Sequence, residues 1–346
     1  MKRIKQVLFS LLATTILAAC AQEATTDPQP APPAGPAQPQ DRTKPEISYT
    51  APFTGLAVAE KSERRPIMVM INNHPKARPQ SGLAQADIVY EILAEGEVTR
   101  LVAIYQSQQP AVIGPVRSIR PYYIEIGAGF DAVMVHAGGS PEALATLSRS
   151  DYAYINEISN SAYFWREKFR QVPHNLYTST QLIEQAMADK GMRLTSELPQ
   201  FTFLPDGAKL SGGETAQQID VTFHPLYRVG YTYDAGKGAY LRFTEGEPHL
   251  ELTTERQLEA TNLLVLAARH RVLDSEGRRH VDVTGPGDGY LFQQGTVRKV
   301  RWKRSGGVIR AYLDEAMSQE APLLPGNTWI NIIPDSPGLS ASVHYQ

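Results

Sequence analysis

Residues 130–144, FDAVMVHAGGSPEAL, join a short apolar run, a glycine turn and the start of a helix. The apolar run at residues 132–135 predicts a buried strand. Ser140 is a favoured N-cap residue, Pro141 fits the first helical turn and Glu142 suits the positive end of the helix dipole. A strand that passes through a tight glycine turn into a helix is typical of a layered α/β domain.

The same two kinds of element surround this stretch. Apolar runs bounded by turn residues predict further buried strands at residues 67–71, 87–93 and 101–105. Helical patterns alternate with the strands at residues 121–128, 141–147 and 179–190. This alternation predicts an α/β layered domain over residues 47–198.

Strand signals dominate the rest of the chain. They lie at residues 219–224, 231–233, 240–243, 263–267, 290–292, 295–304 and 329–333. Alternating patterns with polar turns predict a smaller antiparallel β-rich domain over residues 199–346, so the expected fold class is α+β. Gly285, Gly287 and Gly289 precede a strand rather than a helix, which argues against a dinucleotide site.

The N-terminus carries the pattern of a secretory signal. Lys2, Arg3 and Lys5 precede an apolar run at residues 7–19, which is shorter than the roughly 20 residues that a spanning helix needs. Residues 1–19 therefore predict a signal peptide. Its end, LAAC, places the only cysteine of the chain, Cys20, directly after the expected cleavage site.

This ending resembles the lipobox of bacterial lipoproteins, in which the cysteine is lipidated. Several acyl chains on Cys20 would give stable anchoring in a membrane, and an ordinary signal with a chance cysteine is the alternative. Residues 20–46 are rich in Pro and Ala and predict a lipidated, extended tether. We expect a cell-membrane protein, lipid-anchored, with its body at the extracytoplasmic face.

Three arginines and the glycine turn are the candidate anion site. Guanidinium groups hold phosphates and carboxylates in a bidentate fork, and a glycine turn before a helix presents free backbone N–H groups. The predicted anion-binding residues are Arg100, Arg117, Arg120, Gly138, Gly139 and Ser140. Two alternatives stay open. The arginines could form ion pairs with Glu91, Glu95 or Glu125, and the turn could be a connection without a ligand.

Two proline-stiffened loops carry further polar residues. We expect Asn73, His74 and Arg78 to line a site, since such loops often do. If there is catalysis, the acid–base candidates are His136, His174 and Asp87. His74, His136 and His174, with Asp87 or Glu91, are also metal-ligand types. No two of these histidines have a ligand spacing, so we predict no metal site and leave the cofactor open.

Long segments of the chain resemble the YerB-like lipoprotein family, which is largely a domain of unknown function. In the first region they are residues 73–91, 95–106, 113–123, 131–143 and 173–180. NLLVLAARH, GDGYLFQQGTVRKVRWKR and LLPGNTWINIIP resemble the smaller C-terminal domain of the family. The resemblance implies a lipoprotein with two linked domains and implies no reaction. Glu97 departs from the family, which tends to have a second glycine there.

The layout of the first region is also similar to LytR-CpsA-Psr phosphotransferases, which hold a pyrophosphate with arginines and a metal with aspartates. Arg100, Arg117 and Arg120 match the arginines in type, whereas the acidic ligands have no placed counterpart beyond Asp87. The likeness is one of layout and implies only the possibility of such a reaction.

Three functions follow as hypotheses. The first is an envelope protein that binds an anionic glycan or phosphate ligand, such as a cell-wall polymer, or a partner protein. The second is a phosphotransferase or hydrolase that acts on a phosphate-linked envelope substrate. The third is an assembly factor that uses an apolar or basic surface of the second region, where basic residues alternate along residues 298–304. The chain has 34 basic and 36 acidic residues, and this balance argues against nucleic acid as a partner.

Overall fold

The computed structural model describes residues 49–346. The predicted signal peptide, Cys20 and the tether at residues 20–46 lie outside the described residues. The described residues all belong to one compact unit. Within the described part, no helix is long and apolar enough to cross a membrane.

The predicted elements of the first region are confirmed to within one or two residues. Its main strands are β3 (Ile67–Asn72), β4 (Ile88–Leu93), β5 (Thr99–Tyr105), β6 (Val133–His136) and β7 (Tyr154–Asn156). Its helices are α1 (Pro121–Gly129), α2 (Pro141–Ser148) and α3 (Thr180–Asp189). Strands β3, β4 and β5 are buried along their whole length, as near-continuous apolar runs predict.

Short elements connect these strands and helices. They are β1 (Tyr49–Thr50), β2 (Ala57–Val58), β8 (Trp165–Arg166) and β9 (Leu176–Tyr177), with the 3₁₀ turns η1 (Pro75–Ala77), η2 (Leu83–Gln85), η3 (Glu157–Ser159) and η4 (Ser161–Tyr163). Strands β8 and β9 form a hairpin that stands apart from the main sheet.

The second region is rich in strands, as predicted. They are β10 (Glu214–Thr215), β11 (Gln218–His224), β12 (Tyr227–Asp234), β13 (Ala239–Thr244), β14 (Glu247–Pro248), β15 (Glu259–Ala260), β16 (Asn262–Ala268), β17 (His270–Val272), β18 (Arg279–Val281), β19 (Gly287–Gln293), β20 (Thr296–Ser305), β21 (Val308–Tyr312), β22 (Thr328–Pro334) and β23 (Val343–Tyr345). One short helix, α4 (Leu339–Ser342), precedes the last strand. The α+β fold class is therefore confirmed.

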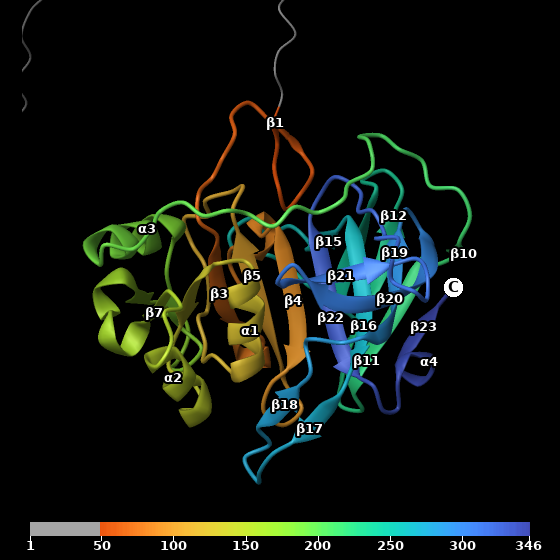
Figure 1. Cartoon of the computed structure of the whole chain (residues 1–346). Helices are drawn as coiled ribbons and strands as arrows, with labels where there is room; N and C mark the ends of the chain where they lie inside the picture. Colours follow the sequence, from red (N-terminus) through yellow and green to blue (C-terminus); the bar gives the residue numbers. More distant parts are fainter. Residues whose placement is uncertain (1–48) are drawn as a thin grey trace, which may run out of the picture. The chain divides into compact units, whose positions relative to one another are not determined.

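A single eleven-stranded sheet runs through both regions. Its order is β10-β20-β19-β16-β22-β4-β5-β3-β6-β7, and β21 also pairs with β20. The junction is β22, which lies between β16 and β4 and is parallel to both, with Ile330 opposite Leu264 and Tyr90 (Figure 1). The two regions thus share one sheet, and β22 adds two parallel pairings to the predicted antiparallel β-rich second region. The remaining pairings of that region are antiparallel.

The core lies on the two faces of this sheet because successive strand residues point to opposite sides. On one face, Met68 and Met70 of β3 belong to an apolar cluster with α1, α2 and β21. On the other face, Val69 and Ile71 belong to a cluster with α3 and a six-stranded sheet in the order β14-β13-β12-β11-β23, with β15 beside β13. Both faces of the main sheet are covered, so functional side chains have to reach solvent at its edges and strand ends.

Candidate functional site

The carboxyl ends of three parallel strands meet at one end of the main sheet. Strand β6 is parallel to both β3 and β7, with Val135 opposite Val69 and Ile155. The three strands end at Asn72, His136 and Asn156. Loops that follow such ends commonly form ligand sites in α/β sheets. We call this end of the sheet the carboxyl edge.

An extended strap, residues 113–120, holds Arg117 at the carboxyl edge. The amide of Asn72 donates to the carbonyl of Pro115 at 2.8 Å, and the amide of Arg117 donates to the carbonyl of Met70 at 2.8 Å. On the other side, the amide of Ala137 donates to the carbonyl of Arg117 at 3.0 Å. The strap therefore fixes Arg117 between the end of β3 and the glycine turn that follows β6.

The Arg117 side chain lacks a counter-ion. It is half-buried and makes no hydrogen bond or ion pair with any residue of the described part. Burial lowers the pKa of Arg117, and the nearby charge of Arg100 lowers it further. An arginine nevertheless stays protonated at neutral pH, so the site holds a partly desolvated cation whose charge no direct contact neutralises.

The other two predicted arginines are ion-paired with Glu95. Arg100 Nη2 lies 3.3 Å from Glu95 Oε2, and Arg100 Nη1 donates to the carbonyl of Ser118 at 3.0 Å. Arg120 contacts the second oxygen of the same carboxylate. Burial raises the pKa of Glu95, but the two arginines together hold it below its usual value. The three predicted arginines are gathered around one carboxylate, and only Arg117 has no direct acidic partner.

Two histidines stack beside this group. The rings of His74 and His174 lie 4.5 Å apart at 22°. Nδ1 of His174 accepts from the amide group of Asn72 at 3.0 Å, and Nδ1 of His74 accepts from the backbone of Lys76 at 3.1 Å. Both rings therefore carry their proton on Nε2 when neutral.

Burial lowers the pKa of both histidines, and nearby cations, including Arg117 in each case, lower it further. The part of this lowering that comes from the cations indicates a positive local potential at the carboxyl edge. Such a potential favours an anion, and it also adds to the cost of leaving Arg117 without one.

The glycine turn adjoins the strap, as the predicted site requires. The amide of Ile119 donates to the carbonyl of Gly138 at 3.1 Å, and the amide of Ser140 donates to the carbonyl of Ile119 at 3.3 Å. Most of the turn's own donors are used: Gly138 N–H binds Asn156 Oδ1 at 3.0 Å, and only the amide of Gly139 lacks an acceptor in residues 49–346. The hydroxyl of Ser140 caps α2, so its role is structural.

His136 does not fit the predicted acid–base role. It is completely buried at the end of β6, and its Nδ1 is hydrogen-bonded to the carbonyl of Gly138 at 2.8 Å. Burial lowers its pKa to about 4. A ring sealed in the core cannot exchange protons with a ligand at the surface.

Asp87 lies at the wrong end of the sheet. Its carboxylate accepts from the backbone amides of Gln106 and Ser107 at 2.6 and 2.9 Å, beside the start of β4. The opposite end of β4 reaches the carboxyl edge, where Ile92 pairs with Arg100. Five strand residues, about 16 Å, separate the two ends, so Asp87 cannot act on a ligand held by Arg117.

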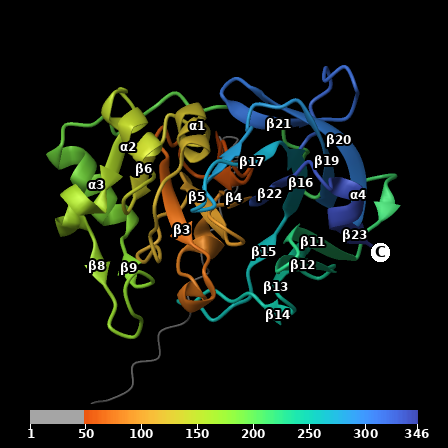
Figure 2. The same cartoon turned by 90° about the horizontal axis from the view of Figure 1, so that it is seen from below.

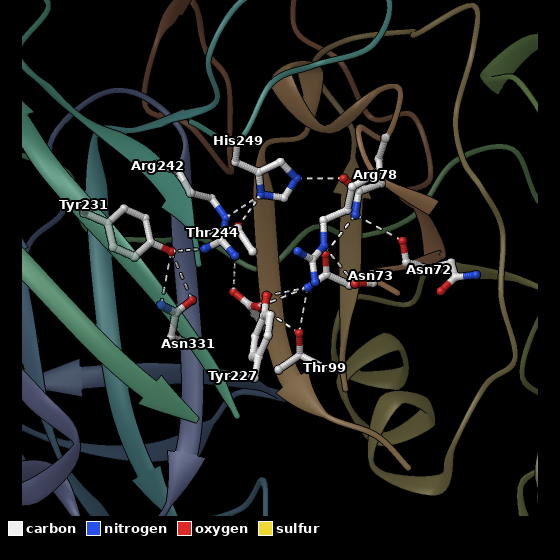
Figure 3. Close-up of polar contacts among 12 residues, drawn as sticks. Asn72, Asn73, Arg78, Thr99, Tyr227, Tyr231, Arg242, Thr244, His249 and Asn331 are labelled. Carbon is white, nitrogen blue, oxygen red and sulfur yellow. Dashed lines mark hydrogen bonds and ion pairs between the residues drawn. The ribbon is translucent and has the colours of Figure 1, made fainter. Parts of the chain in front are cut away.

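Asn73 lies in the interior rather than on an open loop. Its amide group reaches the hydroxyls of Thr99 and Tyr227, each at 2.7 Å, and Glu91 at 3.3 Å (Figure 3). Arg78, which is half-buried, donates to the carbonyl of Asn73 at 3.1 Å and pairs with Glu245 at 3.2 Å. Of the three predicted loop residues, only His74 faces the carboxyl edge.

Sequence reasoning missed the ion pair at the centre of this interior group. Glu91 of β4 and Arg242 of β13 lie 2.8 Å apart and are both 0% exposed. Arg242 also donates to Nδ1 of His249 at 3.0 Å, and His249 Nε2 contacts Gln80 at 2.7 Å. We call these residues, with Asn73, Thr99, Tyr227 and Tyr231, the interior network. The available signal was a single charged residue inside each of two apolar strands.

Two of the five basic residues at positions 298–304 form ion pairs. Arg301 pairs with Asp288, and Arg304 pairs with Glu125 at 2.8 Å. A cavity of about 690 Å³ adjoins this strand, and its lining carries both signs of charge, including Asp282, Asp335 and Lys299. Its mixed lining shows no excess of positive charge, so the carboxyl edge is the stronger candidate for an anion. In the described part, no three His, Cys, Asp or Glu residues are grouped as a metal site.

The comparisons with known proteins all lead to the same protein family. Two family models match the chain: "Protein of unknown function (DUF3048) N-terminal domain" over residues 53–193, and the corresponding C-terminal domain over residues 219–330. The protein named "Putative lipoprotein YerB" of Bacillus subtilis (strain 168) is 41% identical over 295 residues, which cover 84% of this chain and 88% of that protein. The crystal structure of YerB from Bacillus subtilis matches with a TM-score of 0.78 and 39% identity, covering 86% of this chain and 99% of that one.

Proposed function

The chain belongs to the DUF3048 family of YerB-like proteins, and on that premise we propose that it is a lipid-anchored envelope protein that binds an anionic ligand at Arg117. The ligand class is a phosphate or a carboxylate on a glycan, a lipid or a small molecule. Binding is proposed as the function itself, without a chemical step.

The anchor part of the proposal rests on the N-terminal sequence and on the printed name of the relative. Residues 1–19 have the pattern of a signal peptide, and Cys20 follows the expected cleavage site. Lipidation at Cys20 would hold the body at the extracytoplasmic face through the tether of residues 20–46. The name lipoprotein carried by YerB supports this part of the proposal.

The observation that carries the binding part is the uncompensated charge of Arg117. Glu95 is already shared by Arg100 and Arg120, and the stacked pair His74–His174 brings no negative charge. A bound phosphate or carboxylate would supply the missing counter-charge and could accept two parallel hydrogen bonds from the guanidinium group. Protonation of either histidine would strengthen the attraction.

The same geometry favours a binder over the alternative phosphotransferase or hydrolase. A layout like that of LytR-CpsA-Psr enzymes needs an acidic metal ligand next to the arginines. The acidic side chain at that position, Glu95, is held by two arginines, and Asp87 lies at the opposite end of β4. His74 and His174 remain as groups that could exchange protons, so a measured turnover would have to depend on them.

The test is ligand-dependent thermal stability of residues 42–346, which include the whole compact unit. Inorganic pyrophosphate and glycerol 3-phosphate serve as phosphate probes, and citrate serves as the carboxylate probe. At about 100 times its dissociation constant, a ligand should stabilise the native state by about 2.7 kcal/mol. Arg117→Gln should abolish this shift without loss of basal stability, because the side chain has no partner to lose.

The matched control is Arg193→Gln. Arg193 is an exposed arginine that pairs with Asp131 at 2.8 Å, at the amino end of β6 and therefore at the far end of the sheet. This variant should keep the full ligand-induced shift. A wild-type protein that no probe stabilises, or an Arg117→Gln variant that binds as the wild type does, would rule the site out.

A further inference from the structure

The β8–β9 hairpin ends in a tip that exposes apolar side chains. Within the tip, residues 167–173, Phe169 is 61% exposed and Val172 is 66% exposed. Ile158, on the adjacent turn η3, is 72% exposed. The hairpin extends beyond β3 at its end of the molecule (Figure 2). Large apolar side chains grouped at an exposed tip mark an interaction surface.

Unpaired cations accompany these apolar side chains. Lys168 lies beside Phe169 in the tip, and Lys76 lies on η1; both are exposed. Arg170 is half-buried, donates to backbone carbonyls and the Tyr177 hydroxyl, and lies 5.2 Å from the centre of the Phe169 ring. None of the three forms an ion pair within residues 49–346. Of the neighbouring acids, Glu157 pairs with Arg166 at 3.1 Å, whereas Glu167 accepts from the neutral indole of Trp165 at 2.7 Å and keeps its charge.

The tip is fixed to the body rather than loose. Arg170 Nη1 donates to the carbonyl of Ala77 in η1 at 2.8 Å, and its guanidinium group also contacts the carbonyl of Pro79. His174, just after the tip, stacks on His74. These contacts hold η1 and the tip next to each other, and we call the four exposed residues Lys76, Lys168, Phe169 and Val172 on these two segments the hairpin surface.

We propose that the hairpin surface docks on an anionic lipid bilayer, with Phe169 and Val172 in the interfacial layer and Lys76 and Lys168 at the headgroups. Apolar side chains beside lysines match the two layers of such a surface, acyl chains below anionic headgroups. A protein partner of complementary charge is the competing occupant. The bilayer is favoured because the apolar part is only a few side chains wide, which suits shallow insertion better than a stable protein interface.

This inference rests on the proposed membrane anchorage and is independent of ligand binding at Arg117. The lipid tether would hold the body near the bilayer, and the hairpin surface would orient it there. Docking would therefore act as a second, weak membrane contact next to the covalent one.

The test is co-sedimentation of residues 42–346, which lack the lipidation site, with lipid vesicles. The protein should bind vesicles of phosphatidylcholine mixed with phosphatidylglycerol and should bind vesicles of phosphatidylcholine alone much more weakly. The double variant Phe169→Ser/Val172→Ser should weaken binding by about tenfold for each side chain. Lys76→Gln and Lys168→Gln should each weaken it by about fivefold.

Leu226→Ser is the matched control, because Leu226 is 68% exposed but lies in the turn between β11 and β12. It should bind vesicles as the wild type does. Wild-type protein that does not bind the mixed vesicles, or that binds a protein partner only, overturns the inference; so does a double variant that binds no more weakly than Leu226→Ser.

The pyrophosphate assay separates this inference from the proposed function. The Phe169→Ser/Val172→Ser variant should keep its pyrophosphate-induced thermal shift, which also shows that it is folded. Vesicle binding without any pyrophosphate shift in the wild type would contradict the Arg117 site and leave the docking surface standing.

Discussion

The interior network and the carboxyl edge both contain glutamates and arginines, but these residues have different roles in the two places. In the interior network, one carboxylate, Glu91, faces one arginine, Arg242, and neither side chain is exposed to solvent. At the carboxyl edge, one carboxylate, Glu95, serves two arginines, and a third, Arg117, stays unpaired and half-buried. Matched charges in a dry core hold a structure together, whereas surplus cations at a strand end are available to a ligand.

Strand β4 connects the two groups, whose glutamates lie close together in the sequence. Glu91 lies within β4, and Glu95 lies two residues past its end at Leu93. The first glutamate is covered by β12 and β13, and the second is near the surface. The difference in role therefore comes from what packs over each position, since the side chains are identical.

The largest expected effect is the loss of the buried pair. Arg242→Met leaves Glu91 as an uncompensated buried carboxylate, which should cost about 3–5 kcal/mol of unfolding free energy. Urea denaturation measures this loss. Pyrophosphate binding should persist wherever the variant is folded. The double variant Arg242→Met/Glu91→Leu should recover much of the stability, and a single-variant loss below about 1 kcal/mol would contradict the assignment of a dry, matched pair.

The second effect is a dependence of stability on pH that comes from the buried His136. The pKa of His136 falls to about 4 on folding, from an ordinary value near 6.5. Between pH 4 and pH 6.5, His136 is therefore protonated in the unfolded chain and neutral in the folded chain. The stabilisation is complete above pH 6.5 and is lost as the pH falls towards 4, by about 3 kcal/mol in total.

Unfolding free energies measured from pH 7 to pH 4 test this effect. The variant His136→Asn should show a shallower fall than the wild type. His280, an exposed histidine, provides the control, and His280→Asn should keep the wild-type slope. Equal slopes in all three proteins would mean that His136 is not sealed in the core.

The smallest expected effect is at Glu95. Glu95→Gln removes a partly exposed partner of Arg100 and Arg120, which should cost about 1 kcal/mol of stability. It also frees two more cations at the carboxyl edge, so pyrophosphate should bind more tightly than to the wild type. Isothermal titration calorimetry measures the change. The exposed Glu63, paired with Lys61, is the matched control, and weaker binding by Glu95→Gln would contradict a site built on surplus positive charge.

The sequence predicted the elements well because each carries a local signal. Strands such as β3 and β4 are nearly continuous apolar runs, and α2 begins at a serine N-cap followed by a proline. The sequence analysis grouped Arg117, Arg120 and the glycine turn as one candidate site, and the strap and the turn lie side by side.

The charge partners were not predictable in the same way. The pairing of Glu91 with Arg242 depends on how β13 packs over β4, and no local pattern contains that information. Asp87 and Arg117 seemed equally available in the sequence, but they lie at opposite ends of the sheet because β4 runs the full distance between them. Which of the three arginines lacks an acidic partner depends on which carboxylates lie next to each one in the fold. The sequence alone does not contain this information.

The central position of β22 has a consequence for how the chain is made. The strand that completes the middle of the main sheet, Thr328–Pro334, comes within the last twenty residues and pairs with residues near position 88 and position 262. A ribosome that has released the first family segment has not yet supplied the neighbour of β4, so the sheet cannot close until β22 has been synthesised. Pairing over such sequence separation is also slow. Closure of the main sheet therefore requires both family segments, and neither segment can complete this sheet alone.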